Sequence, residues 1–460
     1  MARDITNAQK ISNINDLIDY FVEGCKVKSD LKVGTEHEKI LFNPDNLTPL
    51  PYEGDNGIAV ILEKMADKLK WQKIIDNGNL IGLYDPMTMA AISLEPGGQF
   101  ELSGAPLENI HQTSNELKQH FVNLQQVIQN MQVSILGMGA VPNVCLANLP
   151  QMPKSRYNIM RSYMPQVGTR GLNMMHQTCT IQANLDYCSE EDMRNKMQIS
   201  FKLQPLITAI FAASPFNCAI PNGLLSWRAA IWQDTDNVRC GILPCVFKEN
   251  FGFEDYINWA LDIPMYFILR DNKYHQATDI TFRQFINGAM KNKIKDYHAN
   301  MGDWINHLGT LFPDVRLKQY IEVRGADFGS YEHICALPAL WVGLLYDKNS
   351  LQQITDLTKD WKLEEILTLR DQVPSRALNV TFRKEKLKDI ALKVLNIANL
   401  GLEKRSFINN KQQDETIYLQ PLYDIVKNGE TLANKWRDNY YNEWNLDINK
   451  VFNSAYITIP

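Results

Sequence analysis

The chain has 460 residues, of which 45% are hydrophobic, 22% charged and 10% aromatic, a composition typical of a globular protein with a large buried core. A formal net charge of −5 argues against broad nucleic-acid binding, which needs a basic face. The longest apolar runs, residues 205–215 and 336–346, are too short to cross a bilayer, and the first residues lack the apolar core of a signal peptide. We therefore expect a cytoplasmic protein without nucleic-acid or membrane partners.

The eight cysteines, from Cys25 to Cys335, show neither a C-x-x-C pair nor the spacing of a zinc finger. Reduced thiols are the expected state in a cytosol. A structural or regulatory disulfide is the alternative.

In chain order, hydrophobic periodicity predicts helices and strands in alternation over the first two thirds of the chain. Helices are predicted at 11–25 (capped by Ser12 or Asn13), 56–69, 107–131 and 194–213, and strands at 33–42, 81–84, 90–95, 99–103, 134–138, 175–187 and 319–324. Helices dominate beyond residue 336. This distribution favours an α+β fold over a doubly wound sheet. We expect one large domain over 1–460, with a sheet-rich core at about 30–330 and a helical region at about 336–460.

Polar residues alternate along four of the predicted strands. Because side chains in a strand point to opposite faces in turn, Glu36 and Glu38 share a face, as do Glu322 and Arg324. The same period places two further sets on one face each: Gln99, Glu101 and Ser103, and Thr178, Thr180, Gln182, Asn184 and Asp186. Glu95 precedes a Gly-Gly turn.

A solvated face of an antiparallel sheet would also alternate, and this is the simplest explanation of any single strand. A solvated face does not explain the four strands taken together, because carboxylates placed close together repel unless cations neutralise them. Carboxylate oxygens are the ligands that Mg²⁺ requires, with substrate phosphates completing its shell. The pattern therefore indicates a multi-metal phosphoryl-transfer site.

Two arginines could supply the complementary charge. Arg156 follows Lys154 on a loop that enters a predicted helix, and Arg228 stands beside Trp227. A guanidinium binds carboxylate or phosphate through two parallel hydrogen bonds, as a pocket for an amino acid needs. A surface ion pair is the alternative for either residue. The chain contains no phosphate-binding G-x-x-x-x-G-K-[ST] loop, no dinucleotide fingerprint and no kinase motif set.

Read together, these segments resemble the plant and proteobacterial type of glutamate–cysteine ligase. The matching runs include V-G-T-E-H-E-K, S-L-E-P-G-G-Q-F-E-L-S-G, M-P-K-S-R-Y-N, T-C-T-I-Q-A-N-L-D and Y-I-E-V-R-G-A-D, in family order between about residues 33 and 327. The resemblance implies a glutamine-synthetase-like catalytic fold, a curved and mainly antiparallel sheet forming a funnel braced by helices. It also implies ligation of the glutamate γ-carboxylate to the amine of L-cysteine through γ-glutamyl phosphate, the first step of glutathione synthesis, with ATP consumed.

The resemblance also assigns roles to individual residues. Metal binding, by two or more Mg²⁺ ions, falls to Glu36, Glu38, Glu95, Glu101 and Glu322. The resemblance implies that Arg324, Glu38 and Glu101 take part in catalysis. Arg324 would stabilise charge on the transferring phosphoryl group. The substrate pocket is implied to include Arg156, Thr180, Gln182, Asn184, Trp227, Arg228 and Tyr266.

Three alternatives compete with this interpretation: a ligase with another amine acceptor, a phosphotransferase of the guanidino-kinase type, and a non-catalytic binding protein with the same fold. The last predicts loss of metal carboxylates, yet all five glutamates are present. Plant members carry regulatory cysteine pairs, which we do not transfer to this chain. A monomer and a homodimer are both compatible with the sequence.

Overall fold

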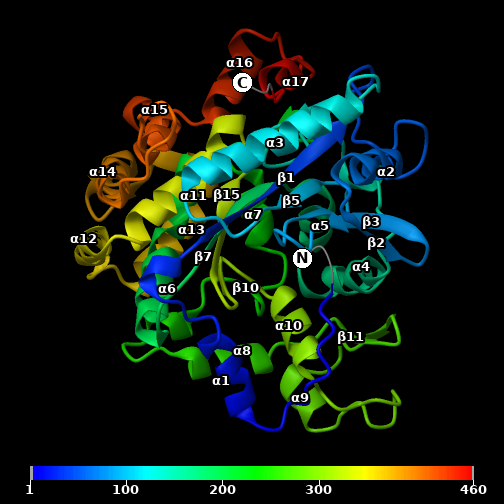
Figure 1. Ribbon diagram of the computed structural model, residues 1–460. Helices are drawn as coiled ribbons and strands as arrows, with labels where there is room; N and C mark the ends of the chain where they lie inside the picture. The colour runs from blue at the N-terminus through cyan, green and yellow to red at the C-terminus, as the bar shows by residue number, and fades with distance from the viewer. Residues whose placement is uncertain (1–3, 458–460) are drawn as a thin grey trace.

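The computed structural model describes residues 4–457 and is built on a nine-stranded antiparallel sheet (Figure 1). In spatial order its strands are β14 (Val315–Leu317), β15 (Ile321–Asp327), β7 (Thr180–Leu185), β1 (Val33–Phe42), β5 (Phe100–Ser103), β4 (Ala91–Leu94), β3 (Asn79–Tyr84) and β2 (Gln72–Asp76), with β6 (Ser134–Leu136) paired to the end of β1. The predicted α+β class with a mainly antiparallel sheet is confirmed.

Helices surround the sheet and occupy most of the chain beyond β15 (Figure 1). They are α1 (Ile14–Val22), α2 (Ile58–Leu69), α3 (Ile110–Ile128), α4 (Arg156–Val167), α5 (Gly171–Gln177), α6 (Glu190–Ile210), α7 (Trp227–Trp232), α8 (Phe253–Leu261), α9 (Phe282–Ile286), α10 (Met301–Gly309), α11 (Tyr331–Leu345), α12 (Lys348–Thr358), α13 (Leu363–Arg376), α14 (Leu387–Arg405), α15 (Gln420–Asn428), α16 (Leu432–Asn442) and α17 (Lys450–Ser454). No helix within residues 4–457 is long and apolar enough to span a membrane.

Four two-stranded sheets complete the strands. They are β8 (Phe216–Asn217) with β9 (Ile220–Pro221), β10 (Cys240–Gly241) with β13 (Phe312–Pro313), β11 (Phe267–Arg270) with β12 (Lys273–Gln276), and β16 (Thr381–Phe382) with β17 (Glu385–Lys386). That residues 1–460 form one domain stays a prediction.

The apolar side of the main sheet packs against α3, α6 and α11. Cys179, Ile181, Ala183 and Leu185, from β7 and the residue before it, are fully buried there. On β1, the His37 ring stacks on Phe121 of α3, with ring centroids 5.7 Å apart. The helices therefore cover one side of the sheet and leave its polar side for the site.

Several predicted boundaries are confirmed and one is wrong. Strand β1 covers the predicted residues 33–42, and Asn13 caps α1 in a capping box with Asp16. The strand predicted to begin at residue 175 begins at Thr180 instead, because residues 171–177 form α5. Residues 174–177 are all buried. A segment that is buried on every side has no hydrophobic periodicity by which a helix could be told from a strand.

A disulfide joins Cys145, in the loop after β6, to Cys218, in the turn of the β8–β9 hairpin. The expectation of reduced thiols throughout is therefore wrong for this pair. The two residues lie 73 positions apart in the sequence, so alternation and spacing along the chain could not pair them. The other six cysteines are free thiols.

Candidate active site

The register of the central strands assembles the polar side of the sheet. Glu36 on β1 lies opposite Gln182 on β7 and Ser103 on β5, and Glu38 lies opposite Glu101 on β5. Directly opposed side chains of antiparallel strands project to the same side of the sheet. The polar strands predicted from alternation therefore meet on one surface.

Four carboxylates line one cavity on this surface: those of Glu36, Glu38, Glu95 and Glu101. Arg156, Gln182 and Arg324 line the same cavity. Glu95 lies in the turn between β4 and β5, where Gly98 adopts a φ of 87°, a conformation that favours glycine. An adjoining pocket shares Glu38, Glu95 and Arg324, and adds Thr180 and Arg228.

The electrostatics of the carboxylates are unfavourable in the absence of a bound cation. Burial, and then the neighbouring charges of Glu101 and Glu95, raise the pKa of Glu38 well above its ordinary value. Burial and the charges of Glu322 and Glu101 likewise raise the pKa of Glu36. Both shifts disfavour the ionised form relative to a carboxyl in water, and a cation between the two glutamates would oppose them.

As they stand, the side chains form no complete metal site. Within residues 4–457, no group of three or more His, Cys, Asp or Glu side chains is arranged so that it could hold a metal ion. The repelling carboxylates nevertheless fit a divalent cation in their chemistry, since they supply hard oxygen ligands around an open cavity.

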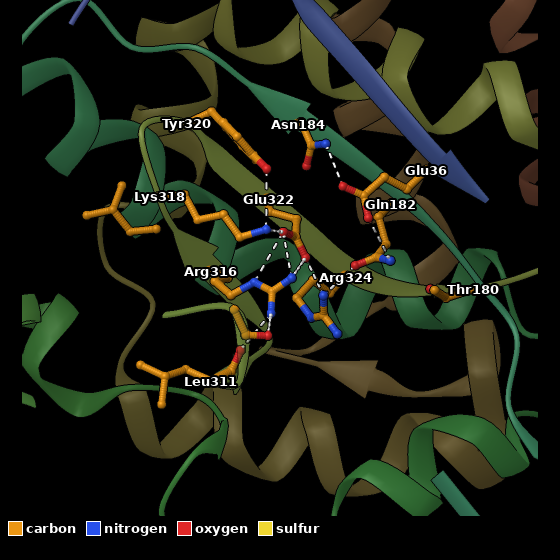
Figure 2. Close-up of polar contacts among 12 residues, drawn as sticks. Glu36, Thr180, Gln182, Asn184, Leu311, Arg316, Lys318, Tyr320, Glu322 and Arg324 are labelled. Carbon is orange, nitrogen blue, oxygen red and sulfur yellow. Dashed lines mark hydrogen bonds and ion pairs between the residues drawn. The ribbon is translucent and has the colours of Figure 1, made fainter. Parts of the chain in front are cut away.

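Glu322 differs from the other four glutamates because its carboxylate oxygens already accept hydrogen bonds from three cationic side chains (Figure 2). Arg316 Nη2 donates to Oε1 at 2.7 Å and to Oε2 at 2.8 Å, Lys318 Nζ donates to Oε2 at 2.7 Å, and Arg324 Nη1 donates to Oε1. Burial raises the pKa of Glu322, but these positive charges outweigh burial and hold its pKa well below the ordinary value.

A β-bulge places Arg324 over the cavity. The pairing of β15 with β7 is regular up to Val323 opposite Ala183 and resumes at Ala326 opposite Ile181, so Arg324 and Gly325 together face Gln182. Arg324 Nη1 donates to Gln182 Oε1 as well as to Glu322 (Figure 2). A Cβ on Gly325 would lie 2.1 Å from Gln204 Oε1, so a side chain there would have to displace the buried Gln204 amide.

Three of the residues assigned to the substrate pocket by resemblance do not line these cavities. Tyr266 is buried under the guanidinium of Arg239, 4.0 Å from its ring centroid. Trp227 Nε1 donates to Gln177 Oε1 at 3.1 Å. Asn184 Nδ2 donates to Glu36 Oε1 at 2.8 Å and so contacts the site through a carboxylate (Figure 2).

Sequence reasoning missed the cations Arg316 and Lys318. A signal was present, since Arg316 on β14 and Lys318 directly after it flank Leu317, and the tight connection to β15 folds both cations onto Glu322. It also missed Phe312, which lines the carboxylate cavity, the adjoining pocket and a third pocket between Arg324 and Arg370. Nothing in the local sequence around Phe312 marks it, because its strand has only two residues.

The fold and the site together define a class: an α+β enzyme whose antiparallel sheet presents carboxylates and arginines to a cavity, as in ATP-dependent carboxylate–amine ligases. The family model described as "Glutamate-cysteine ligase family 2 (GCS2)" matches residues 32–454. The chain belongs to this family, and the resemblance drawn from its motifs is confirmed.

Individual relatives agree with the family. The chain is 47% identical over 437 residues to the chloroplastic glutamate–cysteine ligase of Nicotiana tabacum, covering 95% of this chain and 81% of that protein. It is 47% identical over 440 residues to the chloroplastic enzyme of Arabidopsis thaliana, with the same coverage. A crystal structure of the Francisella tularensis glutamate–cysteine ligase in complex with AMP shares the fold, with a TM-score of 0.54, 14% identity, and coverage of 94% of this chain and 89% of that one.

These findings confirm that the chain is an enzyme of the glutamate–cysteine ligase type with the glutamine-synthetase-like fold expected from the motifs. They contradict the expected cytoplasmic location, because both plant relatives are chloroplastic proteins. Composition does not distinguish the two locations, since chloroplastic and cytosolic enzymes both face an aqueous solvent.

Proposed function

We propose that the chain joins the γ-carboxylate of L-glutamate to the amine of L-cysteine with hydrolysis of ATP, producing γ-glutamylcysteine, ADP and phosphate, as the first step of glutathione synthesis. The observation that carries this proposal is the cavity where four carboxylates and Arg324 converge, in a chain of this family. In the first step the γ-carboxylate attacks the γ-phosphate of ATP. In the second, the cysteine amine displaces phosphate from γ-glutamyl phosphate.

Two or more Mg²⁺ ions would be held by Glu36, Glu38, Glu95 and Glu101, which line the cavity. When bound, the ions neutralise the phosphate oxygens of ATP and orient the terminal phosphate for in-line attack. We give Glu322 a different role from the metal binding implied by resemblance. Its oxygens already accept from three cations, and it holds Arg324 toward the cavity.

Arg324 would stabilise charge on the phosphoryl group in transfer, because its guanidinium lines the cavity beside the carboxylates and its Nη1 is held by the acceptors Gln182 and Glu322. Arg156, Thr180, Gln182 and Arg228 would contact the substrates from the cavity walls. Asn184, Trp227 and Tyr266 would act indirectly, by supporting these walls.

The test is phosphate release from ATP, Mg²⁺ and glutamate, with and without cysteine, and with product identification by mass. The proposal expects cysteine-dependent release and a γ-glutamylcysteine mass, abolished by Glu38→Gln. Glu63→Gln is the matched control, because Glu63 is half-exposed and, among residues 4–457, forms an ion pair with Lys73 alone.

Other outcomes separate the alternatives. Release that depends on another amine would change the acceptor, and a phosphorylated product without an amide would indicate a phosphotransferase. No turnover with any amino acid would contradict the ligase. A monomer or homodimer without nucleic-acid or membrane partners remains our expectation.

A further inference from the structure

The N-terminal arm, residues 4–11, lies along α10, a helix that contributes Asn306 and Gly309 to the wall of the carboxylate cavity (Figure 1). The amide of Ile5 donates to Asn306 Oδ1 at 2.8 Å, and Asn306 Nδ2 donates back to the Ile5 carbonyl at 3.0 Å. The amide of Gly302 donates to the Asn7 carbonyl at 3.0 Å. A Cβ on Gly302 would lie 2.8 Å from the Asn7 nitrogen, so glycine permits this close contact.

At its end the arm delivers a carboxylate to Arg156. Arg156 Nη1 lies 3.0 Å from Asp4 Oδ1, and the Tyr274 hydroxyl donates to Asp4 Oδ2. The side chains of Arg156 and Asp4 are only 11% and 10% exposed. Burial opposes ionisation of Asp4, but Arg156, Tyr274 and Lys154 outweigh it and lower the Asp4 pKa.

Lys154 adds a second cation next to this contact. Its side chain is 1% exposed, and within the described residues its Nζ has no hydrogen-bond acceptor. Burial, and then the charge of Arg156, lower the Lys154 pKa to about 8, while Glu95 and Asp4 oppose the decrease. A buried ammonium without an acceptor is costly unless an anion lies close to it. Arg156, Lys154 and Tyr274 therefore form a receptor for one carboxylate.

We propose that Asp4 occupies the place of a substrate carboxylate, so that the arm competes with the amino-acid substrate for Arg156, Lys154 and Tyr274. The inference rests on the proposed function. The γ-carboxylate of glutamate must stay free to attack phosphate, so the receptor takes the α-carboxylate. Asp4 is the one acidic residue in the arm, and Arg156, with which it is paired, lines the reaction cavity.

In this competition glutamate binds only the molecules whose arm is released. Its apparent affinity is therefore the intrinsic affinity multiplied by the fraction of such molecules. Removing the Asp4 charge should therefore lower KM for glutamate about three- to tenfold and leave kcat nearly unchanged. A purely structural role predicts the opposite, because loss of the ion pair would leave Arg156 misplaced and raise KM.

The experiment compares the unmodified chain with Asp4→Asn and with Asp19→Asn, which removes an exposed acid from α1 as the matched control. KM for glutamate should fall in Asp4→Asn alone. An unchanged or increased KM in Asp4→Asn would overturn the proposal.

Hydrogen exchange of the unmodified chain gives a second test that needs no variant. Glutamate, added with Mg²⁺ and a non-hydrolysable ATP analogue, should increase amide exchange in residues 4–11 and in Gly302. Unchanged exchange there would overturn the proposal, whether or not glutamate shifts the thermal unfolding of the chain. Where a thermal shift occurs, exchange is measured at a glutamate concentration that saturates the shift. Displacement of the arm without turnover would count against the proposed function alone.

Discussion

Glu322 shows how one buried carboxylate can organise several cations. It is fully buried and accepts from Arg316, Lys318 and Arg324. Breaking a buried ion pair by removing one partner typically costs about 3–5 kcal/mol, because the other charge is left uncompensated. We expect Glu322→Gln to lower the free energy of unfolding by about 3 kcal/mol, measured by urea denaturation, and to lower kcat as well.

The control for this change is Glu385→Gln, which removes one partner of the exposed pair between Glu385 and Lys393. Pairs in solvent contribute under about 1 kcal/mol, so the control should unfold nearly as the unmodified chain does. Equal stability of the two variants would show that Glu322 does not hold the cations together.

Arg324 depends on guanidinium geometry and not on charge alone. Its Nη1 reaches both Gln182 on β7 and Glu322 on β15. A lysine would keep the charge but lose the planar donor set that binds phosphate through two hydrogen bonds. We expect Arg324→Lys to lower kcat about 100-fold, in the range seen when one transition-state donor is removed, with an unchanged urea midpoint. A loss confined to KM would contradict a role in phosphoryl transfer.

At the scale of elements, alternation predicted which side chains share a face of the sheet but not the register between strands. The period-two pattern placed Glu36 and Glu38 on one face from local sequence alone, and the pairing with Gln182 and Glu101 confirms it. The bulge at Arg324 could not be predicted, because it exists only in the pairing of β15 with β7, two strands far apart in the sequence. The contact of the arm that carries Asp4 could not be predicted either. Its eight residues show no hydrophobic periodicity, so the sequence does not indicate which element they pack against.

The Cys145–Cys218 disulfide ties the β8–β9 hairpin to the loop after β6. Asn217, next to Cys218, accepts from Gln177, which in turn accepts from Trp227 at the start of α7. A cross-link closing a 73-residue loop restricts the unfolded chain and contributes about 4 kcal/mol in the chain-entropy model. We expect the double variant Cys145→Ser, Cys218→Ser to lose stability of about this size in urea denaturation.

Dithiothreitol provides the control for the disulfide prediction. It should lower the stability of the unmodified chain by a similar amount and leave the double variant unchanged. Insensitivity of the unmodified chain to the reductant would mean that the two thiols are not linked in solution.

At the scale of the whole molecule, the carboxylate cavity contributes to the pH dependence of stability. The folded chain raises the pKa of Glu36 and Glu38 above the ordinary value of 4.5 that they regain on unfolding. At these two groups the metal-free folded state therefore binds more protons than the unfolded state above pH 4.5, and their contribution to stability falls as pH rises through the raised pKa values. The contribution of these two groups is fully present only below their unfolded pKa.

Magnesium should reverse this trend, because it binds the ionised carboxylates and makes their deprotonation favourable in the folded state. We expect Mg²⁺ to raise the unfolding free energy by roughly 2.7 kcal/mol at a concentration 100 times its Kd, and to do so more strongly at pH 8 than at pH 5. Thermal unfolding with and without Mg²⁺ at both pH values measures the effect. Glu38→Gln should weaken the pH dependence of the metal-free chain and the response to Mg²⁺ together, since both arise from the same buried charge. A response to Mg²⁺ that is equal at the two pH values would mean that the ion binds elsewhere.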